Sequence, residues 1–313
     1  MPGTPSLDVV LDTLLTLEPP GPFTSVGAFR AAWRLECLAL LDGNPIDHAL
    51  LGGALADRLG YAFSAGYAAA LRRLVPALGL ETHACLCVTE AGGGHPRAIR
   101  TTLVADGDTF RLTGAKRWAT LAGEGDVLLV AASEGWTGDR NRVRLVSVPA
   151  DAPGVRCEAL PPTPFTPEIP HYEVSLDEVR VDAAAVLPGD GFTAYVKPFR
   201  TIEDLHVSAA TAAYLLSTAR RLQWPVELAA GLAAVVVTLR GLANAPPDAP
   251  GVHLALAGAL SSLRELARAS EPAWAASGDP DGAGRWVRDA PLLGIAEKAR
   301  AARLASAWAT FVG

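Results

Sequence analysis

The hydrophobic period changes twice along the chain, and this order of patterns constrains the fold more than any other feature. Over residues 7–80, apolar side chains such as Phe29 and Trp33 recur at helical spacing. Residues 83–188 contain short β-rich runs bounded by Gly, Asp or Pro. From Phe192 onward the chain is rich in Ala and Leu, which favours long helices. The order predicts an α+β multi-domain chain with an N-terminal helical domain, a middle antiparallel β-barrel or sandwich and a C-terminal four-helix bundle.

The same patterns predict where the domains and their elements begin and end. We expect an N-terminal helical domain at residues 1–82, a middle β-domain at 83–190 and a helix bundle at 191–313. The strands predicted from period-two runs are residues 101–104, 109–112, 127–131, 143–148 and 172–176. The bundle helices predicted between proline breaks are residues 201–222, 225–243, 252–274 and 285–311.

Charge and hydropathy exclude several classes of function. The chain has 313 residues and a net charge of −6 without a basic stripe, so nucleic acid is not expected as a partner. The most hydrophobic segment, residues 228–237, is too short to span a bilayer, so no membrane partner is expected. Residues 1–12 lack the basic start and apolar run of a secretion signal, which favours a cytoplasmic protein.

Neither the cysteines nor the glycines form a recognisable cofactor motif. The four cysteines are Cys37, Cys85, Cys87 and Cys157. We expect Cys85 and Cys87 to point to opposite faces of a strand, so that no metal site forms and the thiols stay free and buried. The glycines at 92–94 lack the spacing of a Rossmann or P-loop motif.

A series of motifs in the middle region resembles one known family. The run CVTEAGGG at residues 87–94 resembles the Thr-Glu-Pro-x-Ala-Gly-Ser-Asp segment that opens the middle domain of acyl-CoA dehydrogenases. The run LTGAKRWAT at residues 112–120 is similar to the Leu-x-Gly-x-Lys-x-Trp-Ile-Thr strand of that family, and residues 148–155 and 174–181 look like its following segments. The chain therefore resembles a shortened, divergent acyl-CoA dehydrogenase, which implies the fold of that family.

The resemblance implies that the middle domain forms one wall of a site for FAD. Trp118 would lie against the isoalloxazine ring, and Thr120 would offer its hydroxyl to the ring nitrogen that receives hydride. Thr89 and the backbone of Val88 would hydrogen-bond the pyrimidine edge of the ring. The alternative for Trp118 is an ordinary core tryptophan. The implied cofactor-binding residues are Val88, Thr89, Gly94, His95, Trp118 and Thr120.

His95 stands where the family has a serine. The resemblance implies that the family's hydroxyl, which serves the flavin pyrophosphate or the thioester, is replaced by an imidazole that could still donate to an anion. A histidine in a surface loop is the alternative.

The resemblance also implies a catalytic base, Glu203, early in the first bundle helix. A carboxylate desolvated beside a flavin and a thioester has a raised pKa, which suits it to remove the α-proton of the substrate. The Arg that follows this Glu in one branch of the family is Asp204 here, and helix capping is the alternative role for both acids. His206 could tune Glu203, act as a base or be a satisfied bundle histidine. His171 could face the acyl pocket or pack at the start of a strand.

These inferences favour FAD-dependent α,β-dehydrogenation of an acyl-CoA-type thioester by a homo-oligomer, a dimer or tetramer built through the helix bundle. The family's Arg-x-x-Phe-Gly and final Gly-Gly-x-Gly-Tyr motifs have no counterpart in these residues. Three alternatives therefore stay open: a non-catalytic scaffold that has lost FAD binding, a subunit completed by a second related chain, and a flavin monooxygenase.

Overall fold

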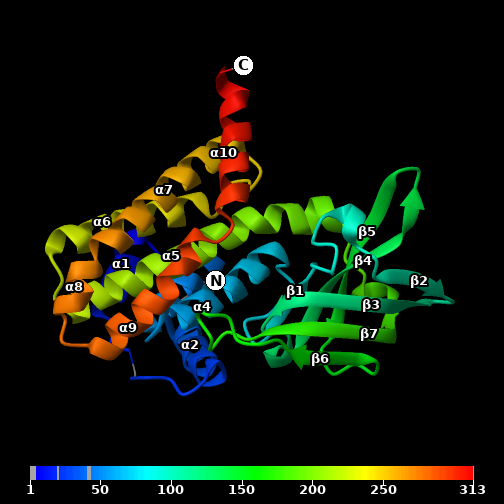
Figure 1. Ribbon diagram of the computed structural model, residues 1–313, viewed down its shortest axis with the longest axis horizontal. Coiled ribbons are helices and arrows are strands. Elements are labelled where there is room, and N and C mark those ends of the chain that lie inside the picture. Colours follow the sequence, from blue (N-terminus) through cyan, green and yellow to red (C-terminus); the bar gives the residue numbers. More distant parts are fainter. Residues whose placement is uncertain (1–4, 20, 41–43, 313) are drawn as a thin grey trace. The chain divides into compact units, whose positions relative to one another are not determined.

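The chain folds into two compact units of different architecture (Figure 1). The computed structural model describes residues 5–19, 21–40 and 44–312. The helical unit comprises Met1–Arg73, Pro164–Glu168 and Thr201–Gly313. The sheet unit comprises Leu74–Thr163 and Ile169–Arg200. The predicted three-domain boundaries stay a prediction, and the two units are described one at a time.

The helical unit is built from both ends of the chain. Its first helices are α1 (Leu7–Thr16), α2 (Val26–Leu40), α3 (Pro45–Leu55) and α4 (Leu59–Leu74). The later helices are α5 (Lys197–Arg221), α6 (Val226–Leu242), α7 (Pro250–Ala269), α8 (Glu271–Ala276), α9 (Pro280–Asp289) and α10 (Glu297–Val312). The division between the units falls within α5.

Glycine brings the early helices close to α5. A Cβ at Gly53 of α3 would collide with the backbone of Ala210, and one at Gly66 of α4 would collide with the backbone at His206. An ion pair between Asp47 of α3 and Arg240 of α6, with Nε and Oδ1 2.6 Å apart, joins the two ends of the chain again. The helices before residue 74 and after residue 200 therefore share one core.

Two of the four predicted bundle helices are divided in the structure. The predicted helix 252–274 breaks at Ser270, between α7 and α8. The predicted helix 285–311 becomes α9, a 3₁₀ segment at Ala290–Gly294 and α10. Pro291 explains the second break, because a proline within a helix lacks the amide hydrogen and clashes with the preceding turn. The C-terminal helical region is confirmed, with more and shorter helices than predicted.

The segment Pro164–Glu168, which follows the sixth strand of the sheet, belongs to the helical unit. The backbone N–H of Thr166 donates to Oδ1 of the fully buried Asp289, 2.7 Å away. Arg288 bonds both oxygens of Asp289 and pairs with Glu168 at 3.2 Å. These contacts hold the segment against the end of α9.

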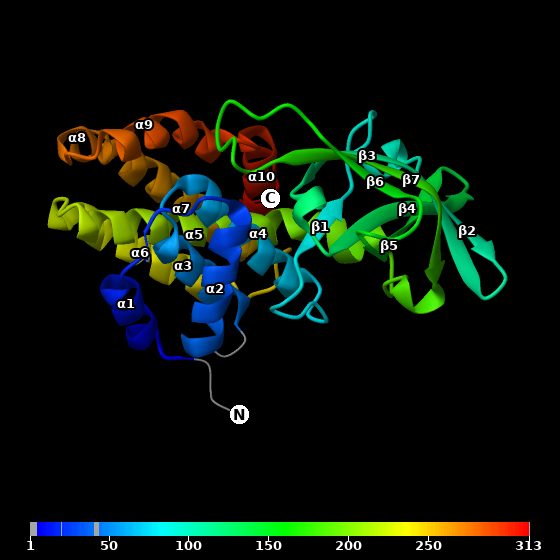
Figure 2. The same cartoon turned by 90° about the horizontal axis from the view of Figure 1, so that it is seen from below.

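The sheet unit contains one curled sheet of seven strands (Figure 2). The strands are β1 (Ala84–Cys87), β2 (Thr102–Asp106), β3 (Thr109–Thr120), β4 (Val127–Thr137), β5 (Arg140–Pro149), β6 (Val155–Ala159) and β7 (His171–Asp182). Their order is β1-β4-β2-β3-β7-β6, and β5 pairs with the other edge of β4. The predicted β-domain is confirmed, and each predicted run lies in or overlaps a strand.

The sheet is mixed, whereas the sequence predicted an antiparallel one. Strand β1 pairs parallel with β4, and β2 meets β4 in a parallel pair at Thr102 and Ser133. Parallel neighbours need a crossover connection, and the β2–β3 hairpin supplies it between β1 and β4. The other pairings are antiparallel.

The expectation for Cys85 and Cys87 is wrong. Residues two apart on a strand point to the same face, and the two buried Sγ atoms lie 3.7 Å apart in the core of the sheet. All four cysteines are free thiols. Within the described ranges, no three His, Cys, Asp or Glu side chains gather as a metal site, and no helix has the length and apolar character needed to cross a membrane.

Candidate functional site

A β-bulge near the end of β3 turns Trp118 out of the sheet. The register jumps between Lys116 and Ala119, so that two residues of β3 oppose one residue of β7. Trp118 occupies the bulge with φ +58°, a conformation that bulky residues rarely adopt. Its side chain is 52% exposed, whereas the flanking Lys116 and Ala119 are buried. The alternative of a core tryptophan is therefore wrong.

The segment of residues 88–94 lies beside this bulge. The backbone N–H of Arg117 donates to the carbonyl of Thr89 at 2.8 Å. A Cβ at Gly94 would lie 3.5 Å from Thr89 Oγ1 and 3.7 Å from Val88 Cγ1, so the three residues are in contact. Val88, Thr89 and Gly94 thus lie together in the sheet unit, and the segment is hydrogen-bonded to the residue before Trp118.

Thr120 and His171 extend the same edge. They face each other as partners in the β3–β7 pairing, and the His171 ring meets the Trp118 indole edge-on, with 6.0 Å between ring centroids. Desolvation lowers the pKa of His171 and outweighs an opposing hydrogen bond with the backbone of Ile169. The imidazole beside the exposed indole is therefore neutral at neutral pH.

A buried ion pair lies directly behind the bulge, and the sequence did not single it out. Lys116 Nζ donates to Glu90 Oε1 at 2.6 Å and to the carbonyl of Ala131 at 2.5 Å, and the two side chains are 0% and 8% exposed. Desolvation favours a higher pKa for Glu90, but the hydrogen bond and charge of Lys116 lower it overall. Glu90 lies in the motif at residues 87–94 and Lys116 in the motif at residues 112–120. Their place in these motifs was the sequence signal that could have identified the pair.

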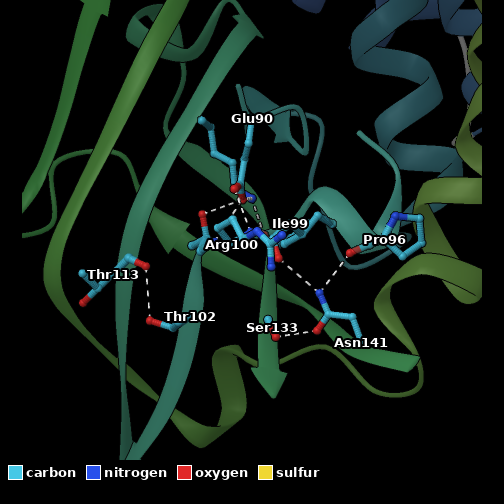
Figure 3. A network of polar contacts seen from close by, with 11 residues as sticks. Glu90, Pro96, Ile99, Arg100, Thr102, Thr113, Ser133 and Asn141 are labelled. Carbon is cyan, nitrogen blue, oxygen red and sulfur yellow. Dashed lines mark hydrogen bonds and ion pairs between the residues drawn. The ribbon is translucent and has the colours of Figure 1, made fainter. Parts of the chain in front are cut away.

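Glu90 and Asn141 pin the loop that follows residue 90 (Figure 3). Glu90 accepts hydrogen bonds from the backbone N–H groups of Arg100 and Thr101 at 2.7 and 3.1 Å. Asn141 Nδ2 donates to the carbonyls of Pro96 and Ile99 at 2.9 and 3.1 Å. Glu90 therefore ties the two ends of the loop, residues 90–101, together, and Asn141 holds the backbone between them.

A shallow pocket of about 700 Å³ lies beside the 90–101 loop. Its walls come from the loop and from β3, and its lining residues are Glu90, Ala91, Gly92, His95, Arg97, Ala98, Arg100, Thr101, Gly114 and Ala115. His95 Nδ1 accepts a hydrogen bond from the backbone N–H of Arg97 at 3.2 Å. His95 thus lines a pocket, whereas Arg97 and Arg100 were not identified from the sequence.

The predicted base, Glu203, lies on α5 in the helical unit and is half-buried. Its neighbour Asp204 forms ion pairs with Arg300 at 2.7 Å and with Arg303, both on α10. Asp204 therefore anchors α10, and the alternative of helix capping is wrong for both acids because α5 begins at Lys197. His206 is completely buried, its Nδ1–H donates to the carbonyl of Ile202 at 2.7 Å, and burial lowers its pKa to about 4. His206 is thus a core histidine rather than an accessible base.

The edge around Trp118 fits a planar, hydrogen-bonding ring. An exposed indole offers an apolar face, and the hydroxyls of Thr89 and Thr120 can donate to or accept from polar atoms at the ring edge. The backbone around them is fixed by the buried pair and by the bulge, so these groups are preorganised.

Comparison with protein families finds a match in the middle of the chain. Residues 85–179 match the model of the acyl-CoA dehydrogenase middle domain. No curated protein matches the sequence.

Solved structures extend the likeness over nearly the whole chain. Butyryl-CoA dehydrogenase from Megasphaera elsdenii is 15% identical with a TM-score of 0.72, over 98% of this chain and 100% of that one. A probable acyl-CoA dehydrogenase from Mycobacterium abscessus is 20% identical with a TM-score of 0.67, over 96% of each chain. A glutaryl-CoA dehydrogenase from Mycobacterium smegmatis in complex with FADH2 is 18% identical with a TM-score of 0.64, over 98% of this chain and 94% of that one. Residues 85–179 thus match the middle domain of acyl-CoA dehydrogenases, and the solved structures show that the chain has the fold of these enzymes.

Proposed function

We propose that the chain binds FAD at the edge formed by Thr89, Trp118 and Thr120 and dehydrogenates an acyl-CoA-type thioester. The observation that carries the proposal is the half-exposed indole of Trp118, held in a left-handed backbone conformation within a β-bulge. Such strain costs about 1–3 kcal/mol and is typical of functional sites. A glutaryl-CoA dehydrogenase of the same fold is known in complex with FADH2, which supports the choice of cofactor.

Each residue has a distinct role in the proposed reaction. A bound flavin would supply the acceptor for the hydride that leaves the β-carbon of the substrate. Trp118 provides the apolar face that orients the ring, while Thr120 and Thr89 hydrogen-bond its polar atoms, joined by the backbone of Val88. Gly94 and His95 continue the binding segment. The carboxylate of Glu203 accepts the proton from the α-carbon.

The first experiment tests cofactor binding. The purified chain is freed of nucleotide and titrated with FAD while the flavin absorbance and fluorescence are followed. We expect saturable binding that Trp118→Ala weakens about tenfold or more, because an aromatic contact is lost. Trp136 is also exposed on the sheet unit, so Trp136→Ala is the matched control and retains affinity. A colourless protein that takes up no FAD would instead favour a non-catalytic scaffold.

The second experiment tests the base. Acyl-CoA thioesters are added anaerobically to the FAD-loaded chain, and bleaching of the flavin absorbance is measured. Glu203→Gln is expected to abolish bleaching without loss of bound FAD, whereas Glu227→Gln, at an exposed position at the start of α6, leaves it unchanged. Bleaching that persists in Glu203→Gln refutes the role of Glu203. A flavin that binds but turns over only with O₂ and a reductant would favour the monooxygenase.

The proposed assembly is a homo-oligomer, a dimer or tetramer formed through the helices. Helix α10 exposes Leu304, Trp308, Phe311 and Val312, which follow one another at helical spacing and form an apolar stripe. Light scattering measures the mass of the wild-type chain and of Trp308→Glu. A wild-type oligomer that the variant converts to monomer supports this assembly, and a monomeric wild type contradicts it.

A further inference from the structure

The strand β6 has one open edge. It stands last in the order β1-β4-β2-β3-β7-β6 and lies at the border of the sheet (Figure 1). Among the strands that the structure describes, it pairs only with β7, in antiparallel orientation. An open edge presents backbone N–H and C=O groups with which a further strand can pair.

The hydrogen bonds at the two ends of β6 show which backbone groups point to the open edge. The N–H of Leu160 donates to the carbonyl of His171 at 2.8 Å, and the carbonyl of Gly154 accepts from the N–H of Asp177 at 3.0 Å. Residues of an antiparallel strand alternately bond the partner and face away from it, so the even-numbered residues of β6 bond β7. The N–H and C=O of Cys157 therefore point outward, and no group in the described ranges bonds them.

Two opposite charges on the solvent face of β6 are also unpaired. The side chains of Arg156 and Glu158 are exposed, and neither forms an ion pair or hydrogen bond within the described part of the chain. Glu158 lies directly opposite the exposed Glu173 in the β6–β7 pairing. Like charges in such positions repel each other, so a cation beside Glu158 would stabilise this face.

A second copy of β6 in antiparallel orientation supplies that cation. When Cys157 of one copy lies opposite Cys157 of the other, the outward backbone groups of the two copies bond each other. The same register places Arg156 of each copy opposite Glu158 of the other, at the closely spaced positions between the hydrogen-bonded pairs.

The charges also disfavour the neighbouring registers. A shift of one copy by two residues keeps the side-chain faces but places Arg156 opposite Arg156, or Glu158 opposite Glu158 when the shift is in the other direction. Like charges directly opposite each other are destabilising. The pattern of charges on β6 therefore selects the register centred on Cys157.

We propose that two copies of this chain associate through β6, as an antiparallel strand pair centred on Cys157, with Arg156 of each copy paired to Glu158 of the other. The contact continues the sheet of one copy into the other. It is separate from the proposed contact through α10 and requires neither flavin nor substrate. A strand of 5 residues buries little surface, so we expect weak association that grows with protein concentration.

Charge reversal tests the proposal in a parent chain that carries Trp308→Glu, which removes the proposed α10 contact. Sedimentation equilibrium measures the mass of the FAD-free chain over a range of protein concentrations at low ionic strength, since salt screens exposed charges. We expect self-association that Arg156→Glu and Glu158→Arg each weaken about tenfold or more, because like charges then face each other twice in the pair. Arg180→Glu, at an exposed position of β7 opposite β3, is the matched control and associates as the parent does.

Mixing the two reversed chains separates charge pairing from a loss of folding. One chain with Arg156→Glu and one with Glu158→Arg bring opposite charges together at both positions, although neither chain pairs well with itself. An equal mixture should therefore associate about as strongly as the parent, and so should the double variant Arg156→Glu/Glu158→Arg. A parent that stays monomeric, a single variant that associates as the parent does, or a mixture that stays monomeric overturns the proposal.

Amide hydrogen exchange locates the contact. The peptide covering residues 155–160 should exchange more slowly at high than at low protein concentration, because association hydrogen-bonds the outward N–H of Cys157, and Arg156→Glu should abolish the difference. Association without a change in this peptide, or protection that is the same at every concentration, refutes the strand pairing. FAD binding is measured by its own titration, so the pairing and the proposed function succeed or fail separately.

Discussion

Replacing Lys116 with Met tests whether the buried pair behind the bulge stabilises the sheet unit. The substitution keeps the aliphatic length and removes the ammonium that lies 2.6 Å from Glu90 Oε1. Breaking one partner of a buried pair costs about 3–5 kcal/mol, because the remaining charge has no counter-ion. Glu90 keeps its hydrogen bonds from Arg100 and Thr101, so we expect the lower end, about 3 kcal/mol.

The assay is thermal unfolding followed by circular dichroism at neutral pH. A loss of about 3 kcal/mol lowers the Tm of a unit as large as the sheet unit by roughly 10 °C. Lys298 is exposed on α10, and Lys298→Met is the control, expected within about 0.5 kcal/mol of the wild type. Adding Glu90→Gln to Lys116→Met is expected to recover part of the loss, because a neutral amide needs no counter-ion. Two results would refute this reasoning. One is that Lys116→Met unfolds at the wild-type temperature. The other is that the stability loss of the double variant equals the sum of the losses of the two single variants.

The pH dependence supplies a second check on the same pair. The folded state lowers the pKa of Glu90, so the pair contributes stability above the carboxyl pKa of the unfolded chain. That contribution is lost as the pH falls through the lowered pKa. The difference in Tm between the wild type and Lys116→Met should therefore narrow in acid, and a constant difference contradicts the assignment.

Four further predictions each concern a single residue. Asp204→Asn removes the charge that anchors Arg300 and Arg303 and is expected to speed amide hydrogen exchange in α10 about tenfold, measured by mass spectrometry. Asp289→Ala leaves the N–H of Thr166 without its buried acceptor, and urea unfolding should show a loss of about 2–3 kcal/mol. Burial lowers the pKa of His206 to about 4, so protonation favours the unfolded chain once the pH falls below the ordinary histidine value. The wild type should lose about 2 kcal/mol between roughly pH 7 and pH 5 from this group, and His206→Leu should lack that loss in urea unfolding. At the bulge, Trp118→Gly should be more stable than Trp118→Ala by about 1 kcal/mol in urea, since glycine alone adopts the left-handed conformation without strain.

Much of the β-region could be predicted because period-two runs and the motifs at 87–94 and 112–120 are local signals. Thr89 and Trp118 were assigned to one wall from the resemblance, and the structure joins them through the hydrogen bond from Arg117 to Thr89. The parallel pairing of β1 with β4 could not be read from either strand, because both are short apolar runs whose direction depends on the connection between them.

Local sequence patterns could not predict the contacts between residues that are far apart in the chain. The ion pair of Asp47 with Arg240 joins the two ends of the chain, and neither residue belongs to a motif. The pattern assigned Asp204 to a helix start, but α5 begins at Lys197, and the partners of Asp204 on α10 depend on how the helix is broken after Pro291. For Cys85 and Cys87 the error was one of strand geometry, which the sequence spacing alone would have corrected.

The buried pair and the exposed indole are two parts of one arrangement. Lys116 must point inward to reach Glu90, and the N–H of Arg117 must reach the carbonyl of Thr89. Ala119 must return to its buried place opposite Tyr172. In this interval β3 has one more residue than β7. Trp118 accommodates the extra residue by adopting a left-handed backbone conformation, and its side chain turns outward. The buried polar contacts therefore fix the direction of an exposed aromatic ring. Packing of the sheet core alone would not require this direction, whereas binding of a planar ligand would require it.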